Sequence, residues 1–234
     1  MSLLTIIQDA AKDIGLIKPS LVIGTSDEQT KQLYSLLVRD GQDLLRRFDW
    51  QALTKEVSFT TLAAETQTAL TTVASDFYRF VDESMFNRTQ HWQVVGPLSG
   101  RQWQRVKSWG AQVGVVNYFR IRGGDILFYP TPSAGDSVYF EYISNKWIES
   151  AGGTAKAAFT ADDDVTVIDE DILTVGTKWR FLRANGMDYS EEFRSYETGL
   201  ESLFGSDGAR AAVDMTGEIV DFNIPMIPDG SWSL

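Results

Sequence analysis

The spacing of apolar residues changes twice along this chain of 234 residues, and that change limits the folds that it can adopt. Residues 2–50 show the three- and four-residue spacing of amphipathic helices. From Leu53 the period becomes two, so that Val57 and Phe59 alternate with polar residues, as in a half-buried strand. Helical spacing returns near Asp169. The pattern predicts an α+β fold in which a β-rich region interrupts a helical one.

Four segments are predicted to be helices, and each has one apolar face. They cover residues 2–15, 26–50, 170–185 and 188–205. Capping boxes, in which side chains satisfy free backbone N–H groups, begin the second helix at Ser26–Gln29 and the fourth at Asp188–Glu191. Gly15 and Gly205 are expected to end the first helix and the last. Because an apolar face must be buried, we expect a bundle of about four helices.

The region between the second and third helices reads as strands joined by turns. Besides the run that begins at Leu53, strand-like runs lie at Phe77–Phe86, His91–Val95, Val115–Arg122, Asp125–Tyr129 and Ser137–Ile143. Gly123-Gly124 between two of these runs is typical of a two-residue hairpin turn. One short helix is expected after Pro97–Ser99, with Trp103 and Trp109 on one face.

The last residues, 206–234, follow neither pattern. They hold five acids against one base, and Pro225 and Pro228 exclude a continuing helix. The segment also contains large apolar residues, which are scarce in ordinary disordered tails. These are Ile219, Val220, Phe222, Ile224, Met226, Ile227 and Trp232. We therefore expect an extended C-terminal arm that docks on a partner, with packing against its own domain as the alternative.

These changes of pattern divide the chain into three predicted parts. Residues 1–50 and 165–205 form a helical domain, and residues 51–164 form a β-rich domain inserted between the second and third helices. Residues 206–234 form the extended C-terminal arm.

Charge is distributed unevenly along the chain. The net charge is −11, yet Ser84 to Gly124 contains no Asp or Glu. This stretch holds six bases, Arg88, Arg101, Arg105, Lys107, Arg120 and Arg122, and six aromatic residues, Phe86, Trp92, Trp103, Trp109, Tyr118 and Phe119. Arg and Trp are preferred anchors of protein interfaces, and surfaces of opposite charge set the orientation in which two partners bind. We rank an interface first, ahead of a core with a solvated basic rim, a single-stranded nucleic acid site and a sugar site.

Few residues could support catalysis or metal binding. The chain has no Cys, and His91 is its one histidine, which we expect at the surface or packed on a strand. Asp162–Asp164 lacks the Gly and the distal Glu of a calcium loop, so a solvated acidic turn is expected. The acids at Asp169–Asp171 suit a helix start. We predict no catalytic, cofactor-binding or metal-binding residues and no enzyme activity.

Membrane and nucleic acid partners are also disfavoured. No apolar run approaches the ~20 residues that cross a bilayer, and the first residues lack the features of a signal peptide. A sequence pI of about 4.6 argues against binding of nucleic acid by the chain as a whole.

Several segments, taken in order, resemble a known family. They are Arg46–Gln51 leading into Phe59-Thr60-Thr61, Gly96–Ser99 before a Trp-bearing helix, Arg120–Asp125, the turn Pro130–Gly135, and Glu141–Ser144 through Trp147. Together they resemble head–tail adaptor (connector) proteins of short-tailed bacteriophages, of the tail tubular protein A type. The resemblance runs from about Leu3 to Gly205.

This resemblance implies a structural virion protein, assembled in the host cytoplasm. Such adaptors form a ring of about twelve copies between the portal vertex and the tail nozzle, and DNA passes through the lumen without specific binding. The helical domain would form the ring, and the six bases of residues 84–124 would contact a neighbouring subunit or the nozzle. The arm would bind the portal through Ile219, Phe222, Ile224, Met226, Ile227 and Trp232. A carbohydrate- or receptor-binding tail module that uses the Trp-rich β region is the alternative.

Overall fold

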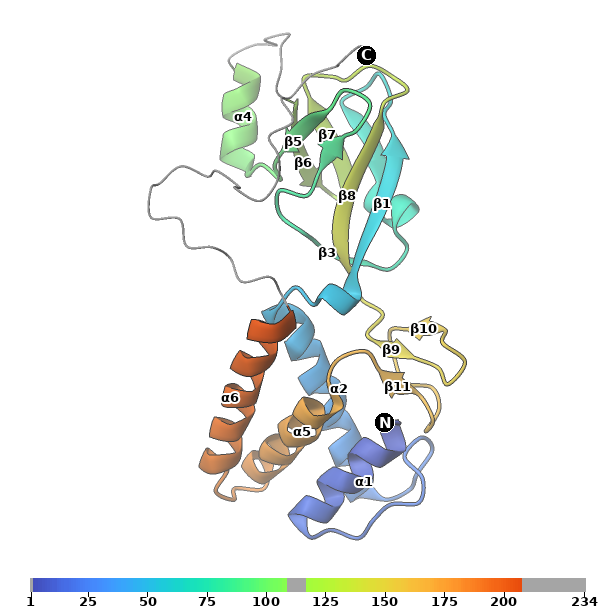
Figure 1. The fold of residues 1–234 in the computed structure, drawn as a ribbon, viewed down its shortest axis with the longest axis vertical. Coiled ribbons are helices and arrows are strands. Elements are labelled where there is room, and N and C mark those ends of the chain that lie inside the picture. Colours follow the sequence, from blue (N-terminus) through green and yellow to red (C-terminus); the bar gives the residue numbers. More distant parts are fainter. Residues whose placement is uncertain (1, 109–116, 208–234) are drawn as a thin grey trace. The chain divides into compact units, whose positions relative to one another are not determined.

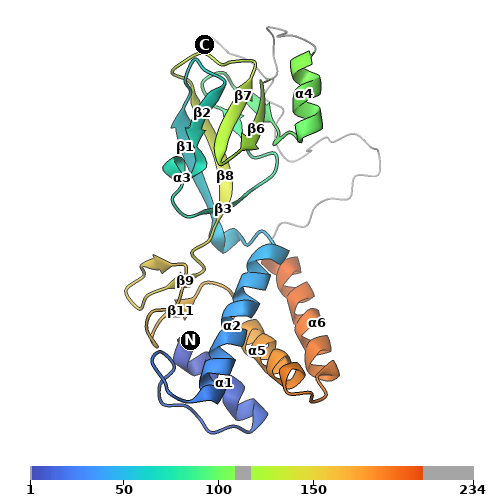
Figure 2. The same ribbon diagram turned by 180° about the vertical axis from the view of Figure 1, so that it is seen from behind.

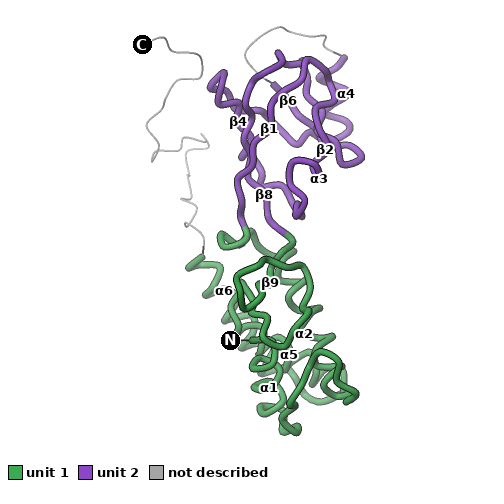
Figure 3. Tube along the Cα trace, turned by 90° about the vertical axis from the view of Figure 1, so that its right-hand side faces the viewer, with its two compact units in different colours: residues 1–53, 145–211 green, residues 54–144, 212–234 purple. Residues whose placement is uncertain are grey.

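The computed structural model describes residues 2–108 and 117–207, and the chain divides into two compact units (Figure 3). Of the described residues, 2–53 and 145–207 form unit 1, and 54–108 and 117–144 form unit 2. Helices dominate unit 1, and a large sheet dominates unit 2. The predicted α+β class is confirmed.

Unit 1 is built on four longer helices (Figures 1 and 2). They are α1 (Leu3–Ile14), α2 (Glu28–Arg47), α5 (Glu170–Ala184) and α6 (Ser190–Asp207). α5 lies against α1, α2 and α6, and α1 also contacts α2. Ser2 caps α1 by accepting the Thr5 N–H, and Asp169 caps α5 by accepting the Ile172 N–H. Gly15 ends α1 in the left-handed conformation, with φ of 80°.

Three predicted helix ends are wrong. Asp188 does not form the expected capping box with Glu191, since its Oδ1 accepts the Ser190 N–H at 3.0 Å at the start of α6. Asp27, not Ser26, caps α2, because its Oδ2 accepts both the backbone N–H and the hydroxyl of Thr30, at 2.9 and 2.6 Å. α6 continues through Gly205 to Asp207. A glycine inside a helix costs only about 1 kcal/mol, and the Asp207 carboxylate accepts the Gln51 N–H at 2.9 Å, which holds this last turn.

The segment after the large sheet belongs to unit 1, so the inserted region ends at Ser144 rather than at residue 164. It contains three short antiparallel strands, β9 (Ile148–Glu149), β10 (Ala155–Lys156) and β11 (Val165–Thr166). The buried Trp147 ring lies so close to Gly41 of α2 that a Cβ at that position would overlap it. This contact explains why the segment stays with the helices.

Two acids of the predicted solvated turn are structural instead. Asp162 accepts the N–H groups of Val22 and Ile23 at 3.0 and 2.7 Å. Asp164 is fully buried and accepts the Lys156 ammonium at 2.6 Å. Burial raises the pKa of Asp164, but hydrogen bonds, first of all that of Lys156, outweigh it and lower the pKa overall. Only Asp163 of the three is exposed.

Unit 2 holds an eight-stranded sheet in the order β1-β8-β4-β5-β6-β7-β2, with β3 also paired to β8. The strands are β1 (Thr54–Thr60), β2 (Thr66–Ala69), β3 (Phe77–Phe80), β4 (Phe86–Asn87), β5 (Trp92–Val95), β6 (Asn117–Arg122), β7 (Asp125–Tyr129) and β8 (Ser137–Ser144). β5 and β6 pair in parallel, whereas β1–β8, β2–β7, β3–β8, β4–β5, β4–β8 and β6–β7 are antiparallel pairs. Phe80, Phe119, Phe128 and Phe140 lie in its buried core.

The sheet differs from the predicted strands in three places. The expected run Phe77–Phe86 is split into β3 and β4, and Glu83 between them has a positive φ of 60°. His91 is exposed and also has a positive φ, of 59°, so β5 begins after it. β2 and the short helix α3 (Leu70–Val73) lack a clear alternating pattern and were not predicted.

The predicted hairpin and short helix of unit 2 are present. Gly123 and Gly124 form the β6–β7 turn with positive φ values. α4 (Gly100–Ser108) begins where Ser99 and Gln102 exchange hydrogen bonds, and Trp103 is buried beneath it. Trp109 lies outside the described residues. In the part of the chain that is described, no helix has both the length and the apolar character needed to cross a membrane.

Candidate functional site

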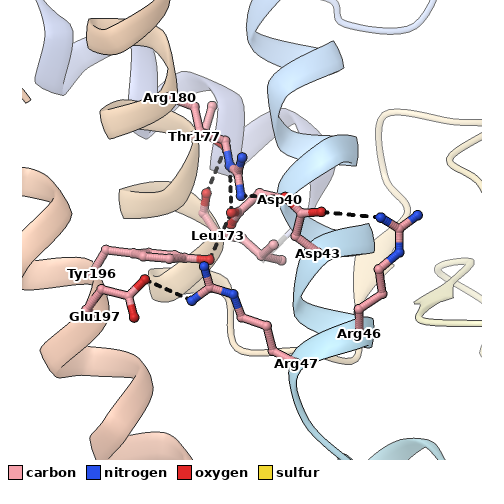
Figure 4. A network of polar contacts seen from close by, with 9 residues as sticks. All are labelled: Asp40, Asp43, Arg46, Arg47, Leu173, Thr177, Arg180, Tyr196 and Glu197. Carbon is pink, nitrogen blue, oxygen red and sulfur yellow. Dashed lines mark hydrogen bonds and ion pairs between the residues drawn. The ribbon is translucent and has the colours of Figure 1, made fainter.

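Three helices of unit 1 meet at a buried carboxylate, Asp40 (Figure 4). Its Oδ1 accepts hydrogen bonds from Arg180 Nε of α5 at 2.8 Å and from the Tyr196 hydroxyl of α6 at 2.9 Å. Arg180 Nη2 also donates to Asp43, one turn further along α2, at 2.9 Å. Asp40 and Tyr196 are both 0% exposed. This network therefore fixes α2, α5 and α6 at one point.

Small residues make room for this contact. A Cβ at Gly176 of α5 would overlap the Asp40 carboxylate. Thr177 beside it is buried but donates its hydroxyl to Leu173 O of its own helix, at 2.8 Å. At the edge of the network, Arg47 pairs with Glu197 of α6 at 2.8 Å in a more exposed position.

The electrostatics of Asp40 are those of an incompletely satisfied buried acid. Burial raises the pKa of Asp40 to about 6, although Arg180 and Tyr196 act in the opposite direction. Its Oδ2 has no hydrogen-bond partner among the described residues. Burial and the neighbouring carboxylate also raise the pKa of Tyr196. The arrangement joins helices and exposes no reactive group to a substrate.

Sequence reasoning missed this network, although one signal was present. Asp40 lies between Leu37 and Leu44 on the apolar stripe of α2, where an unpaired charge would be costly. An acid in that position requires a buried basic partner. The sequence alone does not identify Arg180, which is 140 positions away.

The six bases predicted to form an interface lie in unit 2, and Arg88 and Lys107 form ion pairs with acids of that unit. The exposed Arg88 pairs with Glu56 of β1 and lies 3.8 Å from the centre of the Tyr139 ring of β8. Lys107 of α4 pairs with Glu65 at 2.7 Å and lies over the Trp103 ring. These two bases neutralise acids of their own unit.

The other predicted bases lie on α4 and β6. Arg101 and Arg105 are exposed on α4, and Arg122 is exposed at the end of β6. The Arg120 guanidinium lies beside the first residue of α4, 3.4 Å from where a Gly100 Cβ would be. The structure thus brings the start of α4 and β6 together, and places Arg88 against β1 and β8.

The remaining predicted site residues lie outside the described residues. They are Ile219, Phe222, Ile224, Met226, Ile227 and Trp232. Among the residues that are described, no cluster of His, Asp or Glu could hold a metal ion.

Comparison with known proteins identifies the family. Residues 1–218 match the family model described as SU10 adaptor protein, which represents phage head–tail adaptors. No curated protein matches the chain. Members of such a family are structural components of the virion that interact with portal and tail proteins. Because the match covers more than half of the sequence and confirms the resemblance noted in its segments, the chain belongs to the SU10 adaptor protein family.

Proposed function

We propose that this protein forms a ring that joins the portal vertex to the tail nozzle and surrounds the channel for DNA. The observation that carries the proposal is the adaptor family match across residues 1–218. The ring would have about twelve copies, as the resemblance implies, and it would assemble in the host cytoplasm without a catalytic role. DNA would pass through without specific binding, because a net charge of −11 repels phosphate.

Within this ring, the four helices of unit 1 would act as one bundle and form the wall. In a closed ring each subunit presents two different surfaces to its neighbours, which favours faces of opposite charge. The bases of α4 and β6 supply such a face, since Arg101 and Arg122 are exposed. We propose that they contact an acidic surface of a neighbouring subunit or of the nozzle.

A tagged pull-down from infected cells tests the adaptor role. The full chain is expected to recover a portal protein and a tail-nozzle protein, identified by mass spectrometry. Recovery of neither would contradict the proposal. Charge reversal by Arg101→Glu with Arg122→Glu should reduce this recovery, whereas Arg194→Glu, an exposed change on α6, serves as the matched control.

The portal contact of the C-terminal arm is tested by truncation. Because Asp207 accepts a hydrogen bond from Gln51, the deletion should begin at residue 208 so that α6 keeps its last turn. We expect the shortened chain to fold but to lose portal binding. Normal incorporation of the shortened chain into particles would remove the portal role from the arm residues.

A second candidate, carbohydrate binding by unit 2, is favoured by one pocket. Its volume is about 300 Å³, and its lining residues are Gln90, Trp92, Asn117, Pro130, Thr131, Pro132, Ser133 and Asp136. Aromatic faces with planar polar groups are suited to sugars. Titration of the full chain with host polysaccharide tests this role, and Trp92→Ala should abolish any binding that depends on the pocket. A flat titration with the unmodified chain would exclude it.

A further inference from the structure

A pocket on unit 1 has a chemistry that the adaptor role does not use. It lies between α2 and α5 and has a volume of about 260 Å³. Its lining consists of Leu36, Arg39, Trp179, Arg180, Arg183 and Ala184. We call it the arginine pocket. Three of its six lining residues are arginines and none is acidic, so it is suited to an anion.

The arginines differ in how their charge is balanced. Arg180 is held by Asp40 and Asp43, at 2.8 and 2.9 Å. Arg39 and Arg183 are exposed, and neither has an ion pair in residues 2–108 or 117–207. The pocket therefore carries positive charge that the described parts of the chain leave unneutralised.

The indole of Trp179 gives a second, independent indication. Trp179 is 4% exposed and lines the pocket, yet its buried Nε1 has no hydrogen-bond acceptor among the described residues. A buried donor without an acceptor is unfavourable. The Phe193 and Tyr189 rings pack against this indole and are partly exposed. Arginine beside exposed aromatic rings is the composition of an interface anchor.

We propose that the arginine pocket binds the acidic root of the chain's own C-terminal segment, through Glu218 and Asp221. These carboxylates flank the apolar pair Ile219-Val220 and are followed by Phe222. Carboxylates complement guanidinium groups by charge and by paired hydrogen bonds. The apolar residues between and after them complement the exposed rings of Tyr189 and Phe193. More distal residues, from Ile224 onward, stay available to a partner.

The length of chain after α6 is sufficient for this contact. From Phe193, which packs on Trp179, to Asp207 the helix spans roughly 21 Å, at 1.5 Å per residue. Glu218 follows Asp207 by eleven residues, which can extend to about 36 Å. The same chain can therefore return to its own pocket. A tethered segment also has a high effective concentration, so a weak contact suffices to keep it bound.

Disulfide trapping in the full chain tests the proposal. The sequence contains no Cys, so Ala184→Cys in the pocket and Val220→Cys between the two acids introduce one unique pair. We expect mild oxidation to form an intramolecular disulfide, seen as a monomer with altered gel mobility. Adding Glu218→Lys with Asp221→Lys should slow trapping by about tenfold, because the charge-assisted pairs are lost.

Matched changes separate this contact from random collision. Asp214→Lys with Asp229→Lys makes the same charge change outside the proposed root and should leave the trapping rate unchanged. Arg39→Glu with Arg183→Glu should slow trapping as the lysine changes do, and raised salt should slow it in the unmodified pair. Equal rates in all variants, or disulfides formed only between chains, would overturn the proposal. Portal capture is measured separately, so the adaptor role stands or falls on its own result.

Discussion

Two buried aspartates, Asp40 of unit 1 and Asp76 of unit 2, have opposite properties. In unit 1, burial raises the pKa of Asp40 to about 6, and one of its oxygens lacks a partner among the described residues. In unit 2, burial would also raise the pKa of Asp76, but hydrogen bonds from Lys55, Tyr142 and Ser144 outweigh it and hold the pKa well below its usual range. These three donors lie at 2.6 to 2.7 Å from the carboxylate.

The difference shows that the number and direction of donors, rather than burial alone, decide how a buried acid behaves. Both oxygens of Asp76 accept hydrogen bonds, from groups on β8 and β1. Asp40 receives both of its bonds on one oxygen, and its other oxygen faces Gly176. Asp40 thus depends on the charge of Arg180, whereas Asp76 is stabilised by several groups together.

The largest expected effect comes from Arg180→Met, which leaves Asp40 buried without its charge partner. Removing one member of a buried ion pair costs about 3–5 kcal/mol. We expect the free energy of unfolding of unit 1 to fall by about that amount at pH 8, measured by hydrogen exchange of amides in α2 and α5. Arg194→Met, an exposed change on α6, should have little effect. A small loss for Arg180→Met would mean that the network does not join the helices.

Asp76→Asn tests the other carboxylate and should have a somewhat smaller effect. The amide keeps the shape of the side chain but places an NH₂ group against groups that donate to Asp76, so we expect a loss of about 2–3 kcal/mol in unit 2. Hydrogen exchange of β8 amides measures it. The exposed Asp82→Asn is the control. Stability equal to that of the control would show that the Asp76 hydrogen bonds add nothing to the sheet.

These two sites also show what could be predicted from the sequence. The helix start at Asp169–Asp171 and the Gly123-Gly124 turn were predicted correctly, because they depend on residues only a few positions apart. The Asp40–Arg180 pair joins residues 140 positions apart. A local sequence pattern cannot identify a partner so far along the chain, although an acid in an apolar stripe indicates that a buried basic partner is needed.

The boundary of the inserted region was misplaced for a similar reason. The sequence from 145 to 164 has turn-like composition, which gives no information about the unit that it joins. Its place depends on Trp147 packing at Gly41, and on Asp162 accepting N–H groups of residues 22 and 23. Gly41 can be interpreted as the site of a close contact only once Trp147 is known to pack against it. The interface bases and the arm residues stay predictions.

The two units should respond differently to mild acid. Because the pKa of Asp40 is above its usual value, its contribution to stability is fully present below about pH 4 and is lost as pH rises through about 6. We therefore expect unit 1 to gain about 1 kcal/mol between pH 7 and pH 5. The pKa of Asp76 is lowered, so its contribution is lost only as pH falls below about 4.

Hydrogen exchange, corrected for intrinsic rates, measures this contrast unit by unit. The other shifted acids of unit 1, Asp27, Asp164 and Asp188, have lowered pKa values and titrate below this range. Asp40→Asn should remove the gain in unit 1 and leave unit 2 unchanged. A gain that persists in Asp40→Asn would assign it to general charge repulsion, since the chain carries −11.

The smallest expected effect concerns the exposed pair Arg88–Glu56, which has the same chemistry as Arg180–Asp40 without burial. Its side chains are 54% and 47% exposed. Solvated pairs contribute about 0.2–1 kcal/mol, and stacking of Arg88 on Tyr139 adds a contribution of similar size. Arg88→Ala should therefore lower the stability of unit 2 by about 1 kcal/mol or less, as measured by exchange of β1 and β8 amides.

Glu56→Gln keeps the stacking of Arg88 on Tyr139 and should lower the stability of unit 2 by less still. A loss as large as that of Arg180→Met would show that exposure does not distinguish the two pairs. If Arg88→Ala instead weakens assembly while stability barely changes, the arginine acts on a partner, as the interface proposal requires.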